Sequence, residues 1–267
     1  MREERRGGVL AAARKGFRQP PFPPADRATV PGSGRFVWVR AVCGVGKGSI
    51  MGMQDMEAWE RAAGMAALLA ALLRDEPRGE WLGRLAADEV FAELPYAQDN
   101  EDAEAGRALV EAWLATCDEA ALEAARSDYM ALFVGPGTPL APPWESVCRH
   151  KDEALVFQKE TLEVRAAYQE LGLQVEKLHH EPDDHIAYEL EFLAVAAQQA
   201  ADAAEAGDDG RAAEAEAALR DFLERHLSRW GFAWADMVLE HANTDLYHGL
   251  ALLVKGCLQE ACEQSAA

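Results

Sequence analysis

MQDMEAWERAAGMAALLAALLRDEP, residues 53–77, is the stretch that determines the fold class of this chain. Its apolar residues recur every three or four positions, at Met56, Trp59, Ala63, Ala66, Leu69 and Leu73. That spacing places them on one face of an α-helix, and Pro77 cannot continue a helix. Ala and Leu, which dominate the stretch, are strong helix formers. We therefore predict a long amphipathic helix that packs its apolar face against a core.

The same helical periodicity continues to the carboxyl end of the chain. Helices are expected over 81–94, 102–115, 118–133, 152–171, 183–206, 211–230, 232–242 and 245–262. Asp118 is typical of a helix N-cap, and Gly172 of the position just after a helix. No β-branched, alternating segment of strand length follows residue 50, and no repeat of 30–45 residues is present. The prediction is a single all-α domain of about nine helices over residues 53–267, with a Pro/Gly-rich interhelical loop.

Residues 1–52 differ from the rest in charge and in proline content. They carry ten basic and three acidic residues, a net charge of +7, and the prolines at 20, 21, 23 and 24 exclude a helix there. We interpret this segment as a basic, Pro-rich extension. It is either disordered or a mis-assigned start, with translation beginning at Met51 or Met53.

The charge of the chain excludes several kinds of partner. The 46 acidic and 26 basic residues give a net charge of −20, so residues 53–267 alone carry −27. A protein that binds nucleic acids or anionic membrane surfaces needs concentrated positive charge. The sequence also contains no uninterrupted stretch of 18 apolar residues, the length that a membrane-spanning helix requires. The five cysteines contain no C-x-x-C pair and fit thiols in a reducing cytoplasm. We expect a cytoplasmic protein with no nucleic-acid ligand, whose charged partner is basic.

The first segment that interrupts the helical pattern is YMALFVGPGTPLAPPWESV, residues 129–147. Four prolines and two glycines make it a stiff, non-helical connector. In it, Trp144 places an apolar side chain beside the carboxylate of Glu145. One interpretation is a rigid loop whose tryptophan fills the core. The other is a preformed wall for an apolar peptide, with an anionic group at its edge.

The second segment is HHEPDDHIAYELEF, residues 179–192, in which Pro182 suits the first turn of a helix. The simplest interpretation is a helix start with solvated charges. A second is an anionic receptor, in which Asp183 and Asp184 accept bidentate hydrogen bonds from an arginine while His185, held by Glu189, shapes the rim. A third is a metal site. It would use side chains of ligand type, namely His180, Asp184, His185 and Glu189, but the spacing is not H-E-x-x-H and Pro182 breaks the helical register.

These two segments resemble the signature motifs of the TorD/DmsD/NarJ family of molybdoenzyme maturation chaperones, and of its TorD/DmsD branch in particular. The first motif corresponds to Tyr129, Leu132-Phe133, Gly135-Pro136 and Pro143-Trp144-Glu145-Ser146. The second corresponds to Glu181-Pro182, Asp184-His185, Glu189-Leu190 and Phe192. The spacing of about forty residues between the motifs also fits, and the resemblance covers about four-fifths of the chain. Residues 1–52 have no counterpart in it.

The resemblance implies a function. Such chaperones are all-helical, and they bind the twin-arginine signal peptide or another part of an apo-enzyme until the molybdopterin cofactor has been inserted. The expected partners are therefore the signal peptide and the apo catalytic subunit of a molybdopterin oxidoreductase of the dimethyl-sulfoxide-reductase type. The expected client-binding residues are Tyr129, Leu132, Phe133, Pro143, Trp144, Glu145, Ser146, Asp183, Asp184, His185 and Glu189.

The residues themselves leave two other functions open. One is a metal-dependent helical enzyme that uses His180, His185 and Glu189, and the other is a generic helical adaptor. Catalysis is not expected, because Ser146 lacks a nucleophile-elbow context. We also expect no cofactor and no bound metal, and the sequence contains no nucleotide-binding motif from which to predict a nucleotide site. An exchange of a helical hairpin such as 199–227 between two copies would give a homodimer.

Overall fold

A computed structural model describes residues 36–38, 53–92, 94–150, 155–175 and 181–266. The description below concerns these residues, all of which lie within Phe36–Ala267. The interpretation of residues 1–52 as a basic extension or a mis-assigned start falls almost wholly outside the described residues, so it stays a prediction.

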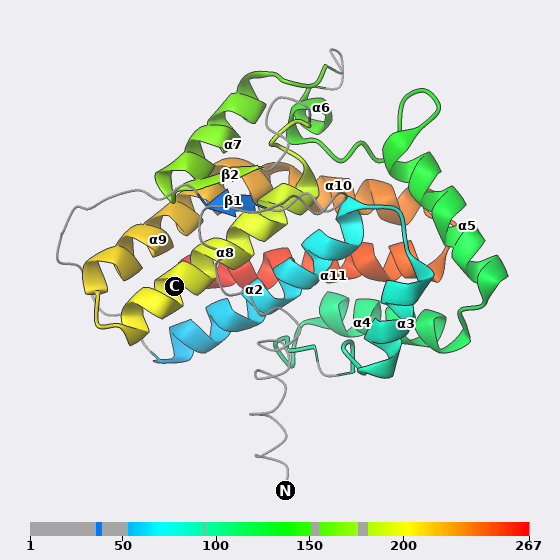
Figure 1. The fold of residues 1–267 in the computed structure, drawn as a ribbon, viewed down its shortest axis with the longest axis horizontal. Coiled ribbons are helices and arrows are strands. Elements are labelled where there is room, and N and C mark those ends of the chain that lie inside the picture. Colours follow the sequence, from blue (N-terminus) through cyan, green and yellow to red (C-terminus); the bar gives the residue numbers. More distant parts are fainter. Residues whose placement is uncertain (1–35, 39–52, 93, 151–154, 176–180, 267) are drawn as a thin grey trace, which may run out of the picture. The chain divides into compact units, whose positions relative to one another are not determined.

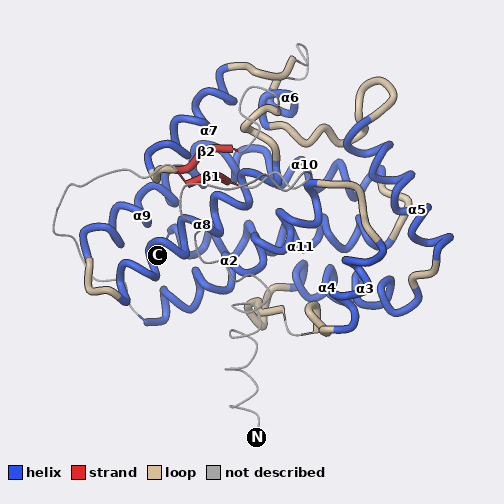
Figure 2. The backbone as a smooth tube through the Cα atoms, in the orientation of Figure 1, coloured by secondary structure: helices blue, strands red, loops and turns tan. Residues whose placement is uncertain are grey.

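The described residues are mainly helical, which confirms the all-α class (Figures 1 and 2). The long helices are α2 (Met53–Arg74), α4 (Glu101–Thr116), α5 (Glu119–Tyr129), α7 (Lys159–Glu170), α8 (Ile186–Glu205), α9 (Asp209–Phe222), α10 (Ser228–His241) and α11 (Asp245–Ala266). The shorter helices are α3 (Gly79–Ala87) and α6 (Glu145–Arg149). Two π-helical turns, η1 (Met130–Val134) and η2 (Leu223–Leu227), extend α5 and α9. Among the described helices, none is both long and apolar enough to cross a membrane.

Two helix ends lie where the sequence places them, and for the expected reason. The carboxylate of Asp118 accepts a hydrogen bond of 2.8 Å from the backbone N–H of Ala121, and so caps the start of α5. Gly172 follows the end of α7 with a φ of +69°, a conformation that favours glycine.

Two other helices are shorter than their apolar pattern suggests. Helix α3 ends at Ala87 instead of continuing to residue 94, because Glu89 has a φ of +52° and turns the chain out of the helix. Helix α8 begins at Ile186 instead of 183, because the side chain of His185 accepts a hydrogen bond from the N–H of Ala187 and caps the helix there.

The sequence did not indicate helix α6, which begins inside the segment expected to be a non-helical connector, or a short antiparallel ladder. Strand β1 (Phe36–Trp38) pairs with β2 (Leu173–Val175), in the register Phe36↔Val175 and Trp38↔Leu173. Each strand has three residues, which is too short for an alternating pattern to be recognised.

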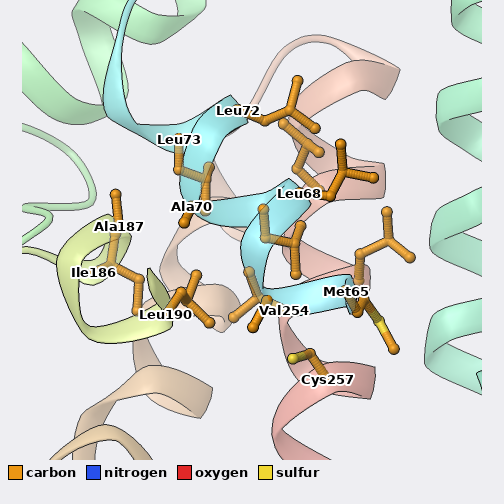
Figure 3. Close-up of a cluster of buried hydrophobic side chains, with 14 of the residues drawn as sticks. Met65, Leu68, Ala70, Leu72, Leu73, Ile186, Ala187, Leu190, Val254 and Cys257 are labelled. Carbon is orange, nitrogen blue, oxygen red and sulfur yellow. The ribbon is translucent and has the colours of Figure 1, made fainter. Parts of the chain in front are cut away.

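The core lies where α2, α8 and α11 pack together (Figure 3). Helix α2 contacts both α8 and α11, and Leu68 and Leu73 of α2 lie near Leu190 of α8 and Val254 of α11. The predicted apolar face of α2 is its buried face, with Trp59, Ala66, Leu69 and Leu73 almost wholly inaccessible.

Helices α4 and α11 approach each other closely at a pair of glycines. A Cβ atom on Gly106 would lie 2.6 Å from the backbone oxygen of Gly249. A Cβ on Gly249 would lie 2.8 Å from the backbone oxygen of Gly106. Since both obstacles are backbone atoms, neither can move without shifting a helix.

We therefore expect Gly106→Ala to lower the free energy of unfolding by about 1–3 kcal/mol through overpacking. The matched control is Gly83→Ala in α3, where an added Cβ meets nothing within 4 Å. There alanine should stabilise the helix by about 0.5–1 kcal/mol. Urea denaturation of both variants measures the two changes, and equal effects would show that the close approach of α4 and α11 is not constrained.

Candidate functional site

The two motif segments meet through their backbones. The N–H of Glu145 donates to the carbonyl oxygen of Asp184 at 2.9 Å, and the N–H of Ile186 donates to that of Pro143 at 2.8 Å. Between these bonds, Trp144 and His185 form an antiparallel bridge. Residues about forty positions apart are thus fixed side by side, and we call this contact the motif junction.

The carboxylate of Asp184 lies beneath the motif junction and is fully buried, with an exposed fraction of 0%. Its Oδ2 accepts a hydrogen bond of 2.8 Å from the N–H of Ser146, and its Oδ1 accepts one of 2.7 Å from the hydroxyl of Thr161. Asp184 therefore connects the start of α6, helix α7 and the segment that precedes α8.

Asp183, its neighbour, is also buried but has a different partner. The guanidinium of Arg165 donates to both of its carboxylate oxygens, at 3.1 and 2.6 Å. The hydroxyl of Tyr168 donates to its backbone oxygen at 3.0 Å. Both carboxylates that the sequence offers as an arginine receptor thus have partners inside the protein, and a peptide arginine could reach them only by replacing those partners.

Glu145 and Glu189 form a second buried layer, and each has an exposed fraction of 0%. Glu145 accepts hydrogen bonds from Arg149 at 2.6 Å, and its other oxygen lies 2.8 Å from Nδ1 of His226. Glu189 accepts a bond of 3.0 Å from the indole N–H of Trp230, while its Oε1 has no partner. His185 and Glu189 are joined through the backbone, where the N–H of Glu189 donates to the carbonyl oxygen of His185 at 3.1 Å, while the His185 ring accepts from Ala187 and the Glu189 carboxylate from Trp230.

The pKa of the Glu189 carboxyl is raised well above its ordinary value. Burial is the main cause, and the negative charges of Glu145 and Asp184 add to it, against the opposing effect of the Trp230 hydrogen bond. The raised pKa favours the protonated form of Glu189, which lessens the repulsion among three buried carboxyl groups.

Three rings form a row at the motif junction. The rings of Trp144 and His185 meet edge to face with centroids 6.0 Å apart, and those of His185 and Tyr188 do the same at 6.0 Å. Trp144 and His185 are half-buried residues, whereas Tyr188 is buried, with an exposed fraction of 2%. Burial and the charge of Arg74 lower the pKa of His185 to about 3, so its ring is neutral.

The aromatic and apolar residues of the first motif lie mostly inward. Tyr129, Leu132 and Phe133 are buried, and Phe133 stacks on Trp234 with centroids 5.7 Å apart. The apolar side chains that the same segment exposes are those of Met130 (39%), Val134 (50%) and Leu140 (45%).

Four functional candidates escaped the sequence analysis. The guanidinium of Arg74, at the end of α2, lies 4.8 Å from the ring centroid of Tyr188 and forms an ion pair with Glu191. The hydroxyl of Tyr188 donates to Glu181 at 2.6 Å. Glu181, Tyr188 and Glu191 lie within the second motif segment and could have been found there. Arg74 had no signal, since it ends an ordinary amphipathic helix.

The described part of the chain does not support the metal-site interpretation, because no three of its His, Cys, Asp or Glu side chains lie where they could hold one metal ion. His185 accepts from Ala187, and Glu189 accepts from Trp230. His180 lies outside the described residues.

Replacing Asp184 tests whether its carboxylate holds the motif junction together. Asp184→Ala leaves the Ser146 N–H and the Thr161 hydroxyl buried without an acceptor, so the free energy of unfolding should fall by about 2–4 kcal/mol. Asp184→Asn should cost about 1 kcal/mol, because the amide can accept from Ser146 and donate to a rotated Thr161 hydroxyl. Chemical denaturation measures both, with the exposed Asp99→Ala as control. Equal losses for the three variants would contradict this role.

Replacing Glu189 tests its protonation. Because its pKa is raised in the folded protein, the unfolded chain releases this proton more readily, and stability falls as pH rises above the ordinary value of 4.5. Glu189→Gln should keep the Trp230 hydrogen bond and remove this loss. Its stability relative to the unsubstituted protein should grow by up to about 1.4 kcal/mol per pH unit.

Denaturation at pH 5, 7 and 9 measures that difference. Glu240→Gln, which changes an exposed carboxyl on α10, is the control and should give a difference that does not vary with pH. A pH-independent difference for Glu189→Gln would show that Glu189 is ionised in the folded protein.

Comparison with known proteins places these motifs in a family. The sequence profile described as "Nitrate reductase delta subunit" matches residues 98–236, which include both motif segments. The Tat proofreading chaperone DmsD of Salmonella typhi is 31% identical over 190 residues, which cover 71% of this chain and 75% of that protein. The chaperone protein TorD of Vibrio cholerae is 30% identical over 154 residues, which cover 55% of this chain and 67% of that protein.

Other alignments are shorter or more distant. The DmsD of Salmonella paratyphi A is 32% identical over 127 residues, and this chain spans only 55% of its length. A solved structure of a redox enzyme maturation protein from Archaeoglobus fulgidus aligns with a TM-score of 0.41 and 20% identity, over 76% of this chain and 94% of that one. The profile match covers more than half of the chain and the Salmonella typhi alignment covers 71% of it, and these two comparisons confirm the resemblance seen in the motifs. The chain therefore belongs to the nitrate reductase delta subunit family, the NarJ/TorD family, and is a maturation chaperone, not an enzyme.

Proposed function

We propose that this chaperone binds the twin-arginine signal peptide, or the apo form, of a molybdopterin oxidoreductase of the dimethyl-sulfoxide-reductase type. It holds that client in the cytoplasm while the cofactor is inserted, before export. The names of its DmsD relatives as Tat proofreading chaperones support the client class. The observation that carries the proposal is the motif junction, which presents the rings of Trp144 and His185 next to acidic side chains.

The outer side of the junction has the chemistry that such a peptide requires. A twin-arginine peptide has two adjacent guanidinium groups and an apolar stretch. Trp144 and the exposed Met130, Val134 and Leu140 supply apolar surface. Binding an apolar segment in this way and adding charged contacts for specificity is a common mode of peptide recognition.

Acidic groups also lie near Tyr129 of the first motif: burial raises the pKa of Tyr129 to about 12, and the charges of Asp75, Glu76 and Glu181 add to that effect. Of these three, Glu181 also acts on His185, whose pKa it raises against the effect of burial. A carboxylate oxygen of Asp75 lies 3.3 Å from a guanidinium nitrogen of Arg78, and one of Glu76 lies 3.7 Å from a guanidinium nitrogen of Arg126. Ion pairs near the surface of this kind contribute little to stability. Such pairs open at small cost, so these carboxylates can serve an incoming cation.

The expected client-binding residues take two roles in this proposal. Trp144 and His185 contact the peptide, with Pro143 supporting the Trp144 backbone. The others hold these two in position from beneath: Tyr129, Leu132, Phe133, Glu145, Ser146, Asp183, Asp184 and Glu189. A loss of binding in an Asp184 variant is then a consequence of a loosened junction.

Isothermal titration with a twin-arginine signal peptide tests the proposal. Trp144→Ala should weaken binding about tenfold, because a half-buried indole contributes on the order of 1–2 kcal/mol to such an interface. Trp113→Ala is the matched control, since Trp113 is a half-buried tryptophan on α4. Binding should also weaken as salt increases, because residues 53–267 carry a net charge of −27.

Equal affinities for the Trp144 and Trp113 variants would contradict the assigned surface. If the Trp144 change altered only stability, a generic adaptor would be favoured. A stoichiometric metal in elemental analysis would favour the metal-dependent alternative. Absence of binding to both the signal peptide and the apo-enzyme would refute the proposed function.

A further inference from the structure

Arg74 occupies a cage that suits a guanidinium group. Its side chain is only 14% exposed, its guanidinium carbon lies 4.8 Å from the ring centroid of Tyr188, and it forms an ion pair with Glu191. An aromatic face combined with a carboxylate is the arrangement that binds guanidinium groups best, because the planar ion can stack and form charged hydrogen bonds together. We call Tyr188, Glu191 and Glu181 the Arg74 cage.

Two carboxylates of the cage lie around the Tyr188 ring. Glu181 accepts a hydrogen bond of 2.6 Å from the Tyr188 hydroxyl, and Glu191 pairs with Arg74. Burial raises the pKa of Tyr188, the charges of Glu181 and Glu191 add to that effect, and Arg74 opposes it. These charges favour a cation beside the ring, which is the place that the Arg74 guanidinium occupies.

The cage is continuous with the proposed peptide surface. Tyr188 meets His185, and His185 meets Trp144, in the row of rings on the motif junction. The charge of Arg74 is also a cause of the lowered pKa of His185. Helices α2 and α8, which carry Arg74 and Tyr188, run side by side (Figure 1).

Arg74 is placed where its side chain can leave without unfolding a helix. It is the last residue of α2, and its backbone oxygen is held by the Tyr129 hydroxyl at 3.0 Å. The backbone is thus fixed at this point, while the guanidinium contacts the side chains of Glu191 and Tyr188. An arginine has several rotatable bonds, so the side chain can swing toward solvent while its Cα stays in place.

We propose that Arg74 is an internal place-holder in a guanidinium site, and that an arginine of the bound client segment exchanges with it. The incoming guanidinium stacks on Tyr188 and pairs with Glu191, and Arg74 turns toward solvent. This inference rests on the proposed function for the source of the incoming arginine. Its consequence is a preference for arginine over lysine, since an ammonium group cannot stack and pair in the same way.

The alternative is a fixed ion pair that only joins α2 to α8. The two roles predict opposite effects of removing Arg74 on the affinity for the peptide. If Arg74 competes with the client, removing it strengthens peptide binding. If it only supports the surface, removing it weakens binding or leaves it unchanged.

The experiment compares Arg74→Ala with Arg220→Ala. Arg220 also pairs with a glutamate, Glu216, and also lies over an aromatic ring, that of Trp59, at 6.0 Å. Trp59 lies fifteen residues before Arg74 in α2, which is about 22 Å along the helix axis. The control therefore removes the same charge, an ion pair and a ring contact from a distant site, together with the bonds that Arg220 donates to the backbone oxygens of Gln264 and Ser265.

Two measurements are made on each variant. Titration with a twin-arginine signal peptide should show about tenfold tighter binding to Arg74→Ala than to Arg220→Ala or the unsubstituted protein, and no such gain for a twin-lysine peptide. Thermal melts with methylguanidinium or methylammonium should show that only methylguanidinium raises the melting temperature of Arg74→Ala. Arg74→Met repeats both measurements with most of the aliphatic packing kept, in case the alanine variant does not fold.

Unchanged or weaker binding of the twin-arginine peptide to both Arg74 variants would overturn the place-holder role. An equal response to methylguanidinium and methylammonium would overturn the guanidinium cage. If no form of the protein bound the peptide, the proposed function and the exchange would both fall, and the melts with methylguanidinium would still show whether the cage binds a guanidinium ion.

Discussion

The buried carboxylate of Asp184 is the constraint on which the rest of the site depends. A carboxylate with no exposed surface is costly unless donors satisfy its oxygens. Here the donors are the backbone N–H of Ser146 and the hydroxyl of Thr161, which come from different helices. These two hydrogen bonds therefore fix α6, α7 and the segment before α8 relative to one another. The positions of the Trp144 and His185 rings follow from that arrangement.

The second buried layer limits how much negative charge the junction can hold. Glu145 is balanced by Arg149 and lies against His226, but Glu189 receives only the indole N–H of Trp230. The raised pKa of Glu189 favours its protonated form, which carries no third negative charge among these buried carboxyl groups. The acidic residues of the two motifs thus form a framework, and contact with a client falls to the rings and carboxylates outside it.

Much of the fold could be predicted because it depends on local patterns. The apolar face of α2 and the Asp118 cap are properties of consecutive residues, and both are present in the structure. The early end of α3 depends on the backbone of Glu89, which no pattern signals. In the candidate site, the motifs identified the two segments that form the site, but they did not indicate in which direction the side chains point. Asp183 points inward because it pairs with Arg165 on α7. Arg74 at the end of α2 contacts Tyr188 on the neighbouring helix α8. Neither contact can be derived from spacing along the chain.

The net charge of this chain has a different meaning once burial is known. A large negative charge attracts any basic partner over long range, so by itself it distinguishes arginine from lysine poorly. Several of the acidic groups nearest the motifs are buried and already bonded, and they add little to recognition. Selectivity for arginine over lysine must come from the few carboxylates that lie beside an aromatic ring. Glu191 and Glu181 around Tyr188 meet that condition, and the arginine they hold belongs to the chain itself. In the proposed function, exposed charge sets how fast a basic segment arrives, and exchange with Arg74 sets which segment stays.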